Sequence, residues 1–252
     1  GMRVVGITNG FRGLIDGATR VLEAAAFDGL LTQGGTILGT SREKPFAQVP
    51  PEERIKDSVA GRSKPEKIME NYRKLGLDCL VILGGNGTHK TARLLSERGL
   101  NVIGLPKTID NDIWGTDVSF GFHSAVDIAT EAIDRLHTTA HSHNRVMVIE
   151  VMGHKAGWLA LYSGIAGGGD VVILPEIPYD IENIAAHLRD RRDRGKPFSI
   201  VVVAEGAVSK EEAADPDAPD RDVPAGERSI GYRVAGEIEA ATDMETRVTV
   251  LG

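Results

Sequence analysis

The sequence predicts an α/β protein built on mostly parallel sheets, and three observations carry this prediction. Short, continuously apolar runs alternate along the chain with longer segments whose apolar residues recur at helical spacing. The short runs lack the strict alternation of a half-exposed sheet, as is typical of parallel strands buried on both faces. Glycine accounts for 30 of the 252 residues and gathers where apolar runs end. Glycine lets the backbone turn sharply from strand to helix, so this placement favours repeated strand–helix units.

The expected elements follow one another along most of the chain. Strands are expected over 4–7, 79–83, 102–105, 146–151, 171–174, 200–204 and 246–252. Helices are expected over 63–75, 88–98, 124–139, 156–166 and 180–194. The first of these helices has Pro65 and Glu66 in its first turn and Gly76 after its end, which are ordinary start and stop signals. Residues 208–228 are rich in Asp and Pro and poor in large apolar groups, so we expect a solvated, mobile loop or insertion there.

Composition excludes several classes of function. The 29 basic residues against 36 acidic ones give a net charge of −7, so nucleic acid and anionic membranes are poor partners. No run approaches the ~20 apolar residues of a membrane helix, and no signal-peptide pattern opens the chain. The single cysteine, Cys79, excludes an internal disulfide, and its apolar surroundings predict a buried, inert thiol. A protein of the reducing cytoplasm is the simplest interpretation.

A glycine-rich turn lies between an expected strand and an expected helix, and is formed by Gly84, Gly85, Asn86, Gly87 and Thr88. Backbone N–H groups at such a turn, together with the positive end of the helix dipole, favour a phosphate. Thr88 is expected to act as a helix cap as well. The turn has neither a Walker A nor a GxGxxG pattern, so a phosphate site and a purely structural turn both stay open.

An acidic turn follows the next strand and contains Lys107, Thr108, Asp110 and Asp112. Ligands of parallel sheets bind beyond the carboxyl ends of the strands, which is where this turn is expected. One carboxylate could take a proton from a hydroxyl nucleophile and the other could hold Mg²⁺. Lys107 could neutralise charge on a moving phosphoryl group. The alternative is an Asx-rich turn that caps itself.

Several segments, in one order along nearly the whole chain, match a known pattern. They are GTILGTSR at 35–42, GGNGT at 84–88, PKTIDND at 106–112, EAIDRLHTTAHSHNR at 131–145, IEVMGHKAGW at 149–158 and AEG at 204–206. Together they resemble the 6-phosphofructokinase family. The resemblance implies transfer of a phosphoryl group from ATP or pyrophosphate, with Mg²⁺, to the 1-hydroxyl of fructose 6-phosphate, giving fructose 1,6-bisphosphate in glycolysis. It also implies a homo-oligomer, since the family is typically tetrameric.

The resemblance assigns a role to each matching position. Asp110 would be the base that takes the sugar hydroxyl proton, with Asp112, Thr108 and Lys107 completing the catalytic set. Arg145 and Arg247 would bind the sugar 6-phosphate from a neighbouring subunit. The residues expected to line the sugar pocket are Met152, Gly153, His154 and Glu205. The residues expected on the phosphoryl donor are Arg42, Gly84, Gly85, Gly87 and Thr88, with Asn86 at the metal.

Three departures from the family pattern bear on these roles. Asn86 stands where the family usually has an acidic residue, so it keeps an oxygen ligand for Mg²⁺ but loses the charge. His154 stands where the family has an arginine in the sugar site. The resemblance also places the first donor loop before residue 1 and the last sugar-phosphate segment after residue 252.

Two features of the sequence point to different phosphoryl donors. Gly87 leaves room for a nucleotide, whereas Lys107 is associated with pyrophosphate users. We favour ATP, because Lys107 can stabilise charge with either donor. Pyrophosphate as donor, another kinase that shares a GGxGT turn (for NAD or lipids), and a non-catalytic sugar-phosphate-binding or regulatory fragment are the alternatives.

The architecture expected from the resemblance is two Rossmann-like, three-layer α/β domains with mostly parallel sheets. Residues 1–121 would bind the phosphoryl donor and residues 122–252 would bind fructose 6-phosphate, with the site between them.

Overall fold

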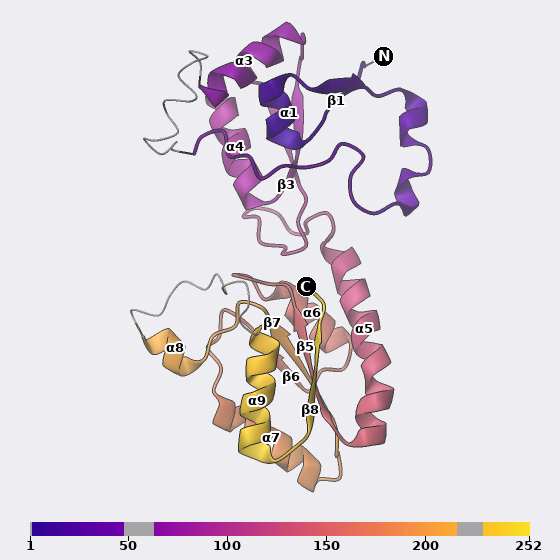
Figure 1. The fold of residues 1–252 in the computed structure, drawn as a ribbon, viewed down its shortest axis with the longest axis vertical. Helices are drawn as coiled ribbons and strands as arrows, with labels where there is room; N and C mark the ends of the chain where they lie inside the picture. The colour runs from indigo at the N-terminus through magenta and orange to yellow at the C-terminus, as the bar shows by residue number, and fades with distance from the viewer. Residues whose placement is uncertain (1, 48–62, 216–228) are drawn as a thin grey trace. The chain divides into compact units, whose positions relative to one another are not determined.

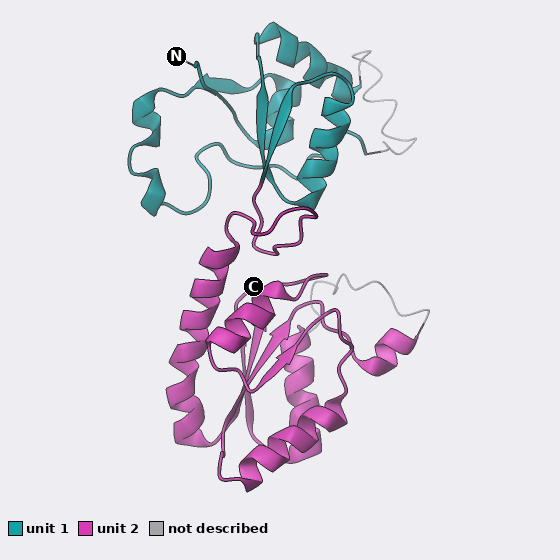
Figure 2. Cartoon of the chain, turned by 180° about the vertical axis from the view of Figure 1, so that it is seen from behind, with its two compact units in different colours: residues 1–105 teal, residues 106–252 magenta. Residues whose placement is uncertain are grey.

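The computed structural model describes residues 2–47, 63–215 and 229–252 (Figure 1). The chain divides into two compact units, residues 1–105 and 106–252 (Figure 2). The sequence predicts the boundary further along, at 121. Residues 106–121 belong with the second unit because Ile109 packs against its hydrophobic core.

The first unit contains two small sheets and the helices around them. Its elements are β1 (Val5–Ile7), α1 (Gly10–Asp16), β2 (Thr19–Val21), the 3₁₀ turns η1 (Ala24–Phe27) and η2 (Leu30–Thr32), α3 (Lys64–Lys74), β3 (Leu80–Gly84), α4 (Asn86–Ser96) and β4 (Val102–Pro106). Strands β1 and β2 pair antiparallel, and β3 is hydrogen-bonded to β4. Their common core is formed around Leu14, Ile68, Leu80 and Leu95. The strand and helix ranges expected between residues 63 and 105 are confirmed to within about two residues.

Helix α3 begins where its sequence signals predict. Ser63 and Glu66 form a capping box, in which the Ser63 N–H donates to Glu66 Oε2 at 2.8 Å. Pro65 lies in the first turn, where its missing N–H costs nothing. These contacts satisfy backbone groups that the helix itself leaves unpaired.

One face of β3 and β4 is open in the described residues. Val81, Leu83 and Ile103 are 51%, 57% and 51% exposed, while Leu80 and Ile82 between them are buried. The expectation of strands covered on both faces is therefore wrong for this sheet. Cys79, predicted to be buried, is half-buried and directly precedes β3.

The second unit is a three-layer α/β/α sandwich. Its elements are α5 (Phe122–His143), β5 (Val146–Val151), α6 (Trp158–Ala166), β6 (Val171–Ile173), α7 (Ile181–Asp193), β7 (Ser199–Ala204), α8 (Lys210–Ala214), α9 (Ile230–Thr242) and β8 (Thr246–Val250). The sheet has the strand order β6-β7-β5-β8, and every adjacent pair is parallel. The predicted parallel sheet is confirmed here.

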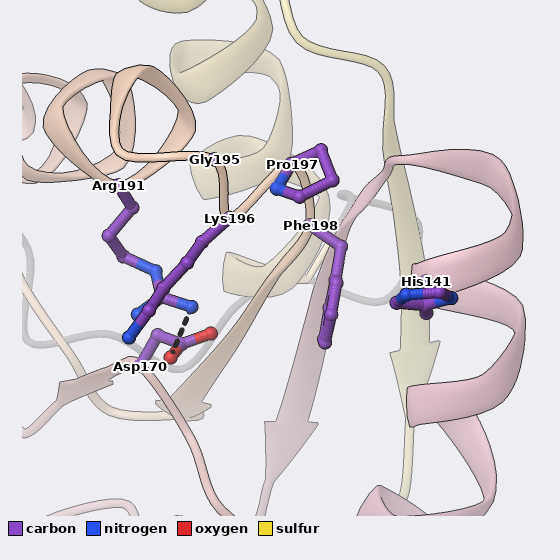
Figure 3. A pocket seen from close by; sticks show the side chains of 7 residues that line it. All are labelled: His141, Asp170, Arg191, Gly195, Lys196, Pro197 and Phe198. Atoms are coloured by element: carbon purple, nitrogen blue, oxygen red, sulfur yellow. Dashed lines mark ion pairs between the residues drawn. The ribbon is translucent and has the colours of Figure 1, made fainter.

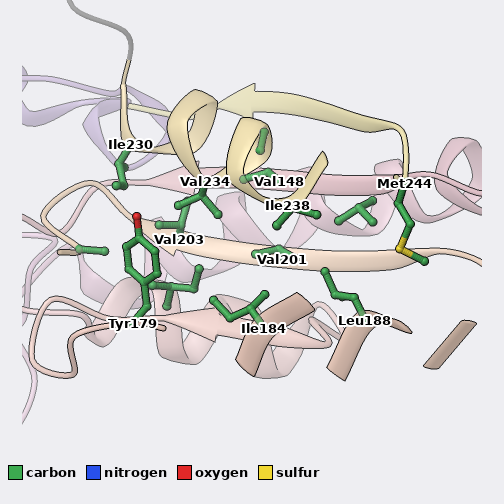
Figure 4. Packing of buried hydrophobic residues seen from close by; sticks show 14 residues of the cluster. Val148, Tyr179, Ile184, Leu188, Val201, Val203, Ile230, Val234, Ile238 and Met244 are labelled. Carbon is green, nitrogen blue, oxygen red and sulfur yellow. The ribbon is translucent and has the colours of Figure 1, made fainter. Parts of the chain in front are cut away.

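Hydrophobic side chains fill both sides of this sheet. Helices α7 and α9 cover one face, where Leu188 and Ile238 pack on Val148 and Val201 (Figure 4). Helices α5 and α6 cover the other face, where residues such as Ile133 and Leu159 pack on the alternate side chains of β5 and β7. Every residue of β5 and β7 is buried, which explains why both runs are apolar apart from Glu150 and Ser199.

The segment 208–228 is not irregular throughout. Residues Lys210–Ala214 form the short helix α8, which Ser209 and Glu212 start with a capping box. The prediction of a loop is therefore wrong for this part, because polar composition does not prevent a well-capped helical turn. The rest of the predicted loop, from 216 to 228, lies outside the described residues.

Two glycines give opposite expectations for substitution by alanine. A Cβ on Gly206 would lie 1.8 Å from the carbonyl oxygen of His154, whereas a Cβ on Gly236, inside α9, would meet nothing within 4 Å. Gly206→Ala should lower the free energy of unfolding by about 1–3 kcal/mol or more through overpacking. Gly236→Ala should raise it by about 0.5–1 kcal/mol through helix propensity. Urea unfolding of both variants measures the difference, and equal stability of the two would contradict the close approach at Gly206.

Candidate functional site

The glycine-rich turn forms the start of helix α4. Strand β3 ends at Gly84, Gly85 is the N-cap, and Asn86 is the first helical residue. Thr88 therefore lies within the first turn and is not the cap that the sequence predicts. Its side chain packs on Gly84, where a Cβ would lie 2.5 Å from Thr88 Oγ1. A Cβ on Gly87 would meet nothing within 4 Å, so this residue faces open space.

The acidic turn after β4 is organised by its own side chains. The Thr108 hydroxyl donates to Asp110 Oδ2 at 2.9 Å, and the Asp110 N–H donates back to Thr108 Oγ1 at 3.2 Å. Ser119 ties the far side of the loop to this turn, donating from Oγ to the Thr108 carbonyl at 2.7 Å. Asn111, at a φ of 53°, accepts from the Ser119 N–H at 2.8 Å. The half-buried Asp110 carboxylate is thus held in a fixed direction, while Lys107 and Asp112 are exposed.

The carboxyl ends of β5 and β7 bring a further group of predicted residues together. The Glu205 N–H donates to the carbonyl of Val151 at 2.9 Å, and the Gly206 N–H donates to the carbonyl of Gly153 at 3.1 Å. The Glu205 carboxylate accepts from the Gly153 N–H at 3.4 Å. Gly153 has a φ of 145° and closely approaches the carbonyl of Ala156, so a side chain there would be strained. Met152 and His154 flank Gly153 and are exposed.

The two predicted phosphate-binding arginines lie at the other end of the same sheet. Arg145 directly precedes β5, and Arg247 is the second residue of β8. Both are ion-paired with Glu245, which lies 2.9 Å from Arg145 Nε through Oε2 and contacts Arg247 through Oε1. The hydrogen bond from Arg145 lowers the pKa of Glu245.

Within one chain these arginines are far from the sugar-pocket residues. The six residues of β5 separate Arg145 from Met152, and strands rise ~3.3 Å per residue, so the two ends are about 20 Å apart. The structure therefore groups Met152, Gly153 and Glu205 at one edge, and Arg145 and Arg247 at the opposite edge.

Arg42, predicted on the donor, is exposed in the irregular stretch that follows η2. Its neighbour Glu43 is ion-paired with Lys64 at 3.0 Å, which anchors this stretch to the start of α3.

A hollow that the sequence did not predict lies at the amino ends of β6 and β7 (Figure 3). It is lined by His141, Asp170, Arg191, Gly195, Lys196, Pro197 and Phe198. Arg191 is ion-paired with Asp170 at 2.6 Å, and Asp170 also accepts from the Ile200 N–H at 2.9 Å. This pair is largely buried and links α7 to the edge of the sheet. The sequence did not predict this ion pair because Asp170 and Arg191 are brought together only by the order of the strands in the sheet.

The histidines near residue 140 are structural. His137 Nε2 is 2.7 Å from the carbonyl of Gly167, and His141 packs edge-on against Phe198. Across residues 2–47, 63–215 and 229–252, no three His, Cys, Asp or Glu side chains are placed to hold a metal ion together. No helix in the same ranges is long and apolar enough to cross a bilayer.

The parallel sandwich, the glycine-rich helix start and the acidic turn after a strand define an α/β protein with glycine-rich and acidic turns at its strand ends. The chain belongs to the phosphofructokinase family, whose model, described as "Phosphofructokinase", matches residues 1–252. An ATP-dependent 6-phosphofructokinase of Spirochaeta thermophila is 68% identical over 254 residues, covering 100% of this chain and 69% of that protein. ATP-dependent 6-phosphofructokinase 3 of Bacteroides thetaiotaomicron is 54% identical, covering 100% of this chain and 68% of that protein.

Solved structures that resemble this chain include phosphofructokinases. The T-state phosphofructokinase of Pichia pastoris matches with a TM-score of 0.82 and 31% identity, covering 100% of this chain and 26% of that chain. A pyrophosphate-dependent phosphofructokinase of Nitrosospira multiformis matches with a TM-score of 0.77 and 22% identity, over 99% of this chain and 60% of that chain. At that identity the second match shows the fold alone.

Proposed function

We propose that the protein transfers the terminal phosphoryl group of ATP to the 1-hydroxyl of fructose 6-phosphate, giving ADP and fructose 1,6-bisphosphate in glycolysis. The observation that carries this proposal is the 68% identity, over the full length of this chain, to an ATP-dependent 6-phosphofructokinase. A cytoplasmic location follows from such an activity.

Asp110 is the general base in this proposal. The hydroxyl of Thr108 holds its carboxylate at 2.9 Å, which limits the directions from which the carboxylate can accept a proton. As the sugar oxygen bonds to phosphorus and the bond to the ADP oxygen breaks, the proton of the 1-hydroxyl passes to Asp110. Lys107, exposed beside it, offsets charge on the transferring phosphoryl group, and Asp112 assists through contacts to metal or sugar.

The donor phosphates bind at the start of helix α4. The N–H groups of Gly85, Asn86, Gly87 and Thr88 are among those that an α-helix leaves without intrahelical acceptors. Gly84 is kept small by Thr88, and the open space at Gly87 leaves room for a nucleotide. Arg42 supplies a cation to the same donor.

Magnesium fits this donor set only in part. Its usual ligands are one or two carboxylates, substrate phosphates and water, whereas Asn86 offers only a neutral amide oxygen. When bound with ATP, Mg²⁺ neutralises phosphate charge. Asn86 is the residue of this donor site that would hold it.

The sugar lies at the carboxyl edge of the second unit. Met152, Gly153, His154 and Glu205 line its ring, in keeping with the contacts that join Gly153 to Glu205. Arg145 and Arg247 lie about 20 Å and about 16 Å away along the strands of the same chain, so they serve the site of a neighbouring subunit. The protein is therefore proposed to act as a dimer or tetramer, with residues 1–121 binding the donor and residues 122–252 the sugar.

A donor comparison tests the function. The full-length protein is incubated with fructose 6-phosphate and either ATP or pyrophosphate, and products are identified by ³¹P NMR. Fructose 1,6-bisphosphate and ADP are expected with ATP. Faster turnover with pyrophosphate would overturn the choice of donor. Calorimetric binding of fructose 6-phosphate without turnover on any donor would favour a non-catalytic sugar-phosphate-binding protein.

Lys107 gives a separate prediction about the donor. Lys107→Gly should abolish any residual turnover with pyrophosphate, while turnover with ATP falls by no more than about tenfold. The reason is that ATP brings further binding contacts, whereas pyrophosphate depends on local charge. Lys107→Arg, which keeps the charge, is the matched control. Equal losses with both donors would contradict this role of Lys107.

A further inference from the structure

Glu245 is the carboxylate that both predicted phosphate-binding arginines contact. The parallel register pairs Val146 with Thr246 and Met147 with Arg247, so Arg145 lies beside Glu245 on the neighbouring strand. Glu245 and Arg247 are two residues apart in the chain and therefore point to the same face at the start of β8. The sheet register alone brings the three side chains together.

The surrounding charges leave Glu245 as the anion that these arginines share. Glu239, a second carboxylate near Glu245, accepts from the N–H and the hydroxyl of Thr246 at 2.9 and 2.8 Å. These hydrogen bonds and, to a smaller extent, the charge of Arg247 lower the pKa of Glu239. His143 also lowers the pKa of Glu245, as the last of its causes. This end of the sheet consequently carries two arginines and one carboxylate that is ion-paired with both.

We propose that Glu245 is a resident counter-ion, which pairs with Arg145 and Arg247 before substrate binds and is displaced when the 6-phosphate of the sugar binds. This inference rests on the proposed function, in which the two arginines bind that phosphate. A phosphate monoester carries a charge of about −1.5 to −2 at pH 7 and offers three acceptor oxygens, so it can satisfy both guanidinium groups better than one carboxylate.

The exposures of the three side chains suit such an exchange. The Glu245 side chain is 46% exposed and that of Arg247 is 51% exposed, whereas that of Arg145 is 23% exposed. The Glu245 side chain can therefore rotate towards solvent without repacking a core, whereas the less exposed Arg145 side chain stays in place. Because the strand register already fixes both arginine backbones, the charge of Glu245 matters more for competition with phosphate than for positioning.

The test is the Glu245→Gln variant of the full-length protein. Glutamine keeps the length and an oxygen acceptor but removes the competing charge. An exposed ion pair is worth at most a factor of about five, and Glu245 forms two, so the KM for fructose 6-phosphate should fall about three- to ten-fold. The kcat should change less than two-fold. Inorganic phosphate, as a competitor of fructose 6-phosphate, should bind more tightly by a similar factor.

A matched control removes a carboxylate from an unrelated pair. Glu131→Gln breaks the exposed pair with Arg135 on α5, removes the same charge, and should leave both the KM and phosphate inhibition unchanged. Thermal unfolding of each variant reports whether the fold is kept.

Variants of the arginines separate the phosphate-binding role of Arg145 and Arg247 from the counter-ion role of Glu245. If Arg145→Ala and Arg247→Ala leave the KM unchanged, the proposed phosphate-binding role fails and the role of Glu245 fails with it. If they raise the KM while Glu245→Gln leaves it unchanged or raises it, the counter-ion role alone is wrong, and Glu245 then only positions the arginines.

Discussion

Asp110→Asn is expected to lower kcat by a factor of about 10²–10⁴, the usual contribution of a general base. Asparagine has nearly the same shape and can still accept the hydrogen bond from Thr108, so the loop should keep its conformation. It cannot take the proton of the sugar hydroxyl. The KM for fructose 6-phosphate should stay within a few-fold, because proton transfer is needed in the transition state and not for binding. A coupled assay of ADP production on the full-length protein measures both constants.

Asp117→Asn is the matched control for this experiment. Asp117 lies in the same loop and is exposed, and its backbone carbonyl, which the substitution retains, accepts from the Asn111 side chain at 3.4 Å. This variant should keep the wild-type kcat. If Asp110→Asn retained more than a tenth of the rate, another group would be the base.

Removing the arginines should act mainly on the affinity for the sugar. Arg145→Ala and Arg247→Ala are each expected to raise the KM for fructose 6-phosphate roughly ten- to hundred-fold, because charge-assisted hydrogen bonds to the phosphate are lost. The kcat at saturating sugar should fall much less. Arg135→Ala, which removes an exposed arginine of α5, is the control and should leave the KM unchanged. Initial rates over a range of fructose 6-phosphate concentrations give both constants.

Mixed oligomers test whether the arginines act across a subunit boundary. Asp110→Asn subunits supply intact arginines, and Arg145→Ala subunits supply an intact Asp110. Mixing the two should create hybrid sites with both groups and recover activity at low fructose 6-phosphate. If activity does not recover although hybrids form, the arginines do not serve a neighbouring site.

The fold of the second unit could be predicted because its sheet is buried on both faces. Continuous apolar runs such as 200–204 are typical of parallel strands that lie between two layers of helices, as this strand does. Helix α9 escaped prediction although Ile230, Val234 and Ile238 recur at its helical spacing. In the first unit, the strand expected over 4–7 is present as β1, whereas α1 and β2 are too short for periodicity to be informative. The open face at Val81 and Leu83 has no signature in the sequence, because an apolar run looks the same whether one face or both are covered.

Site residues that follow the ends of strands could be predicted from the sequence. Contacts that depend on how one strand is aligned with its neighbour could not. The resemblance assigns Gly153 and Glu205 to one pocket, and in the structure each follows a strand of the same parallel sheet, with the Gly153 N–H donating to the Glu205 carboxylate at 3.4 Å. The pairing of Arg145 with Glu245 joins residues a hundred positions apart, and only the register of β5 against β8 brings them together. The residues around each position do not indicate which strand will lie beside it or in which register.

A crystal structure of the full-length protein with fructose 6-phosphate and a non-hydrolysable ATP analogue tests the role of Asp110 most directly. A carboxylate oxygen of Asp110 should lie about 2.6–3.2 Å from the sugar 1-hydroxyl, with that hydroxyl facing the terminal phosphate of the analogue. A 1-hydroxyl that is hydrogen-bonded to a different basic group, with Asp110 turned away from the sugar, would contradict it.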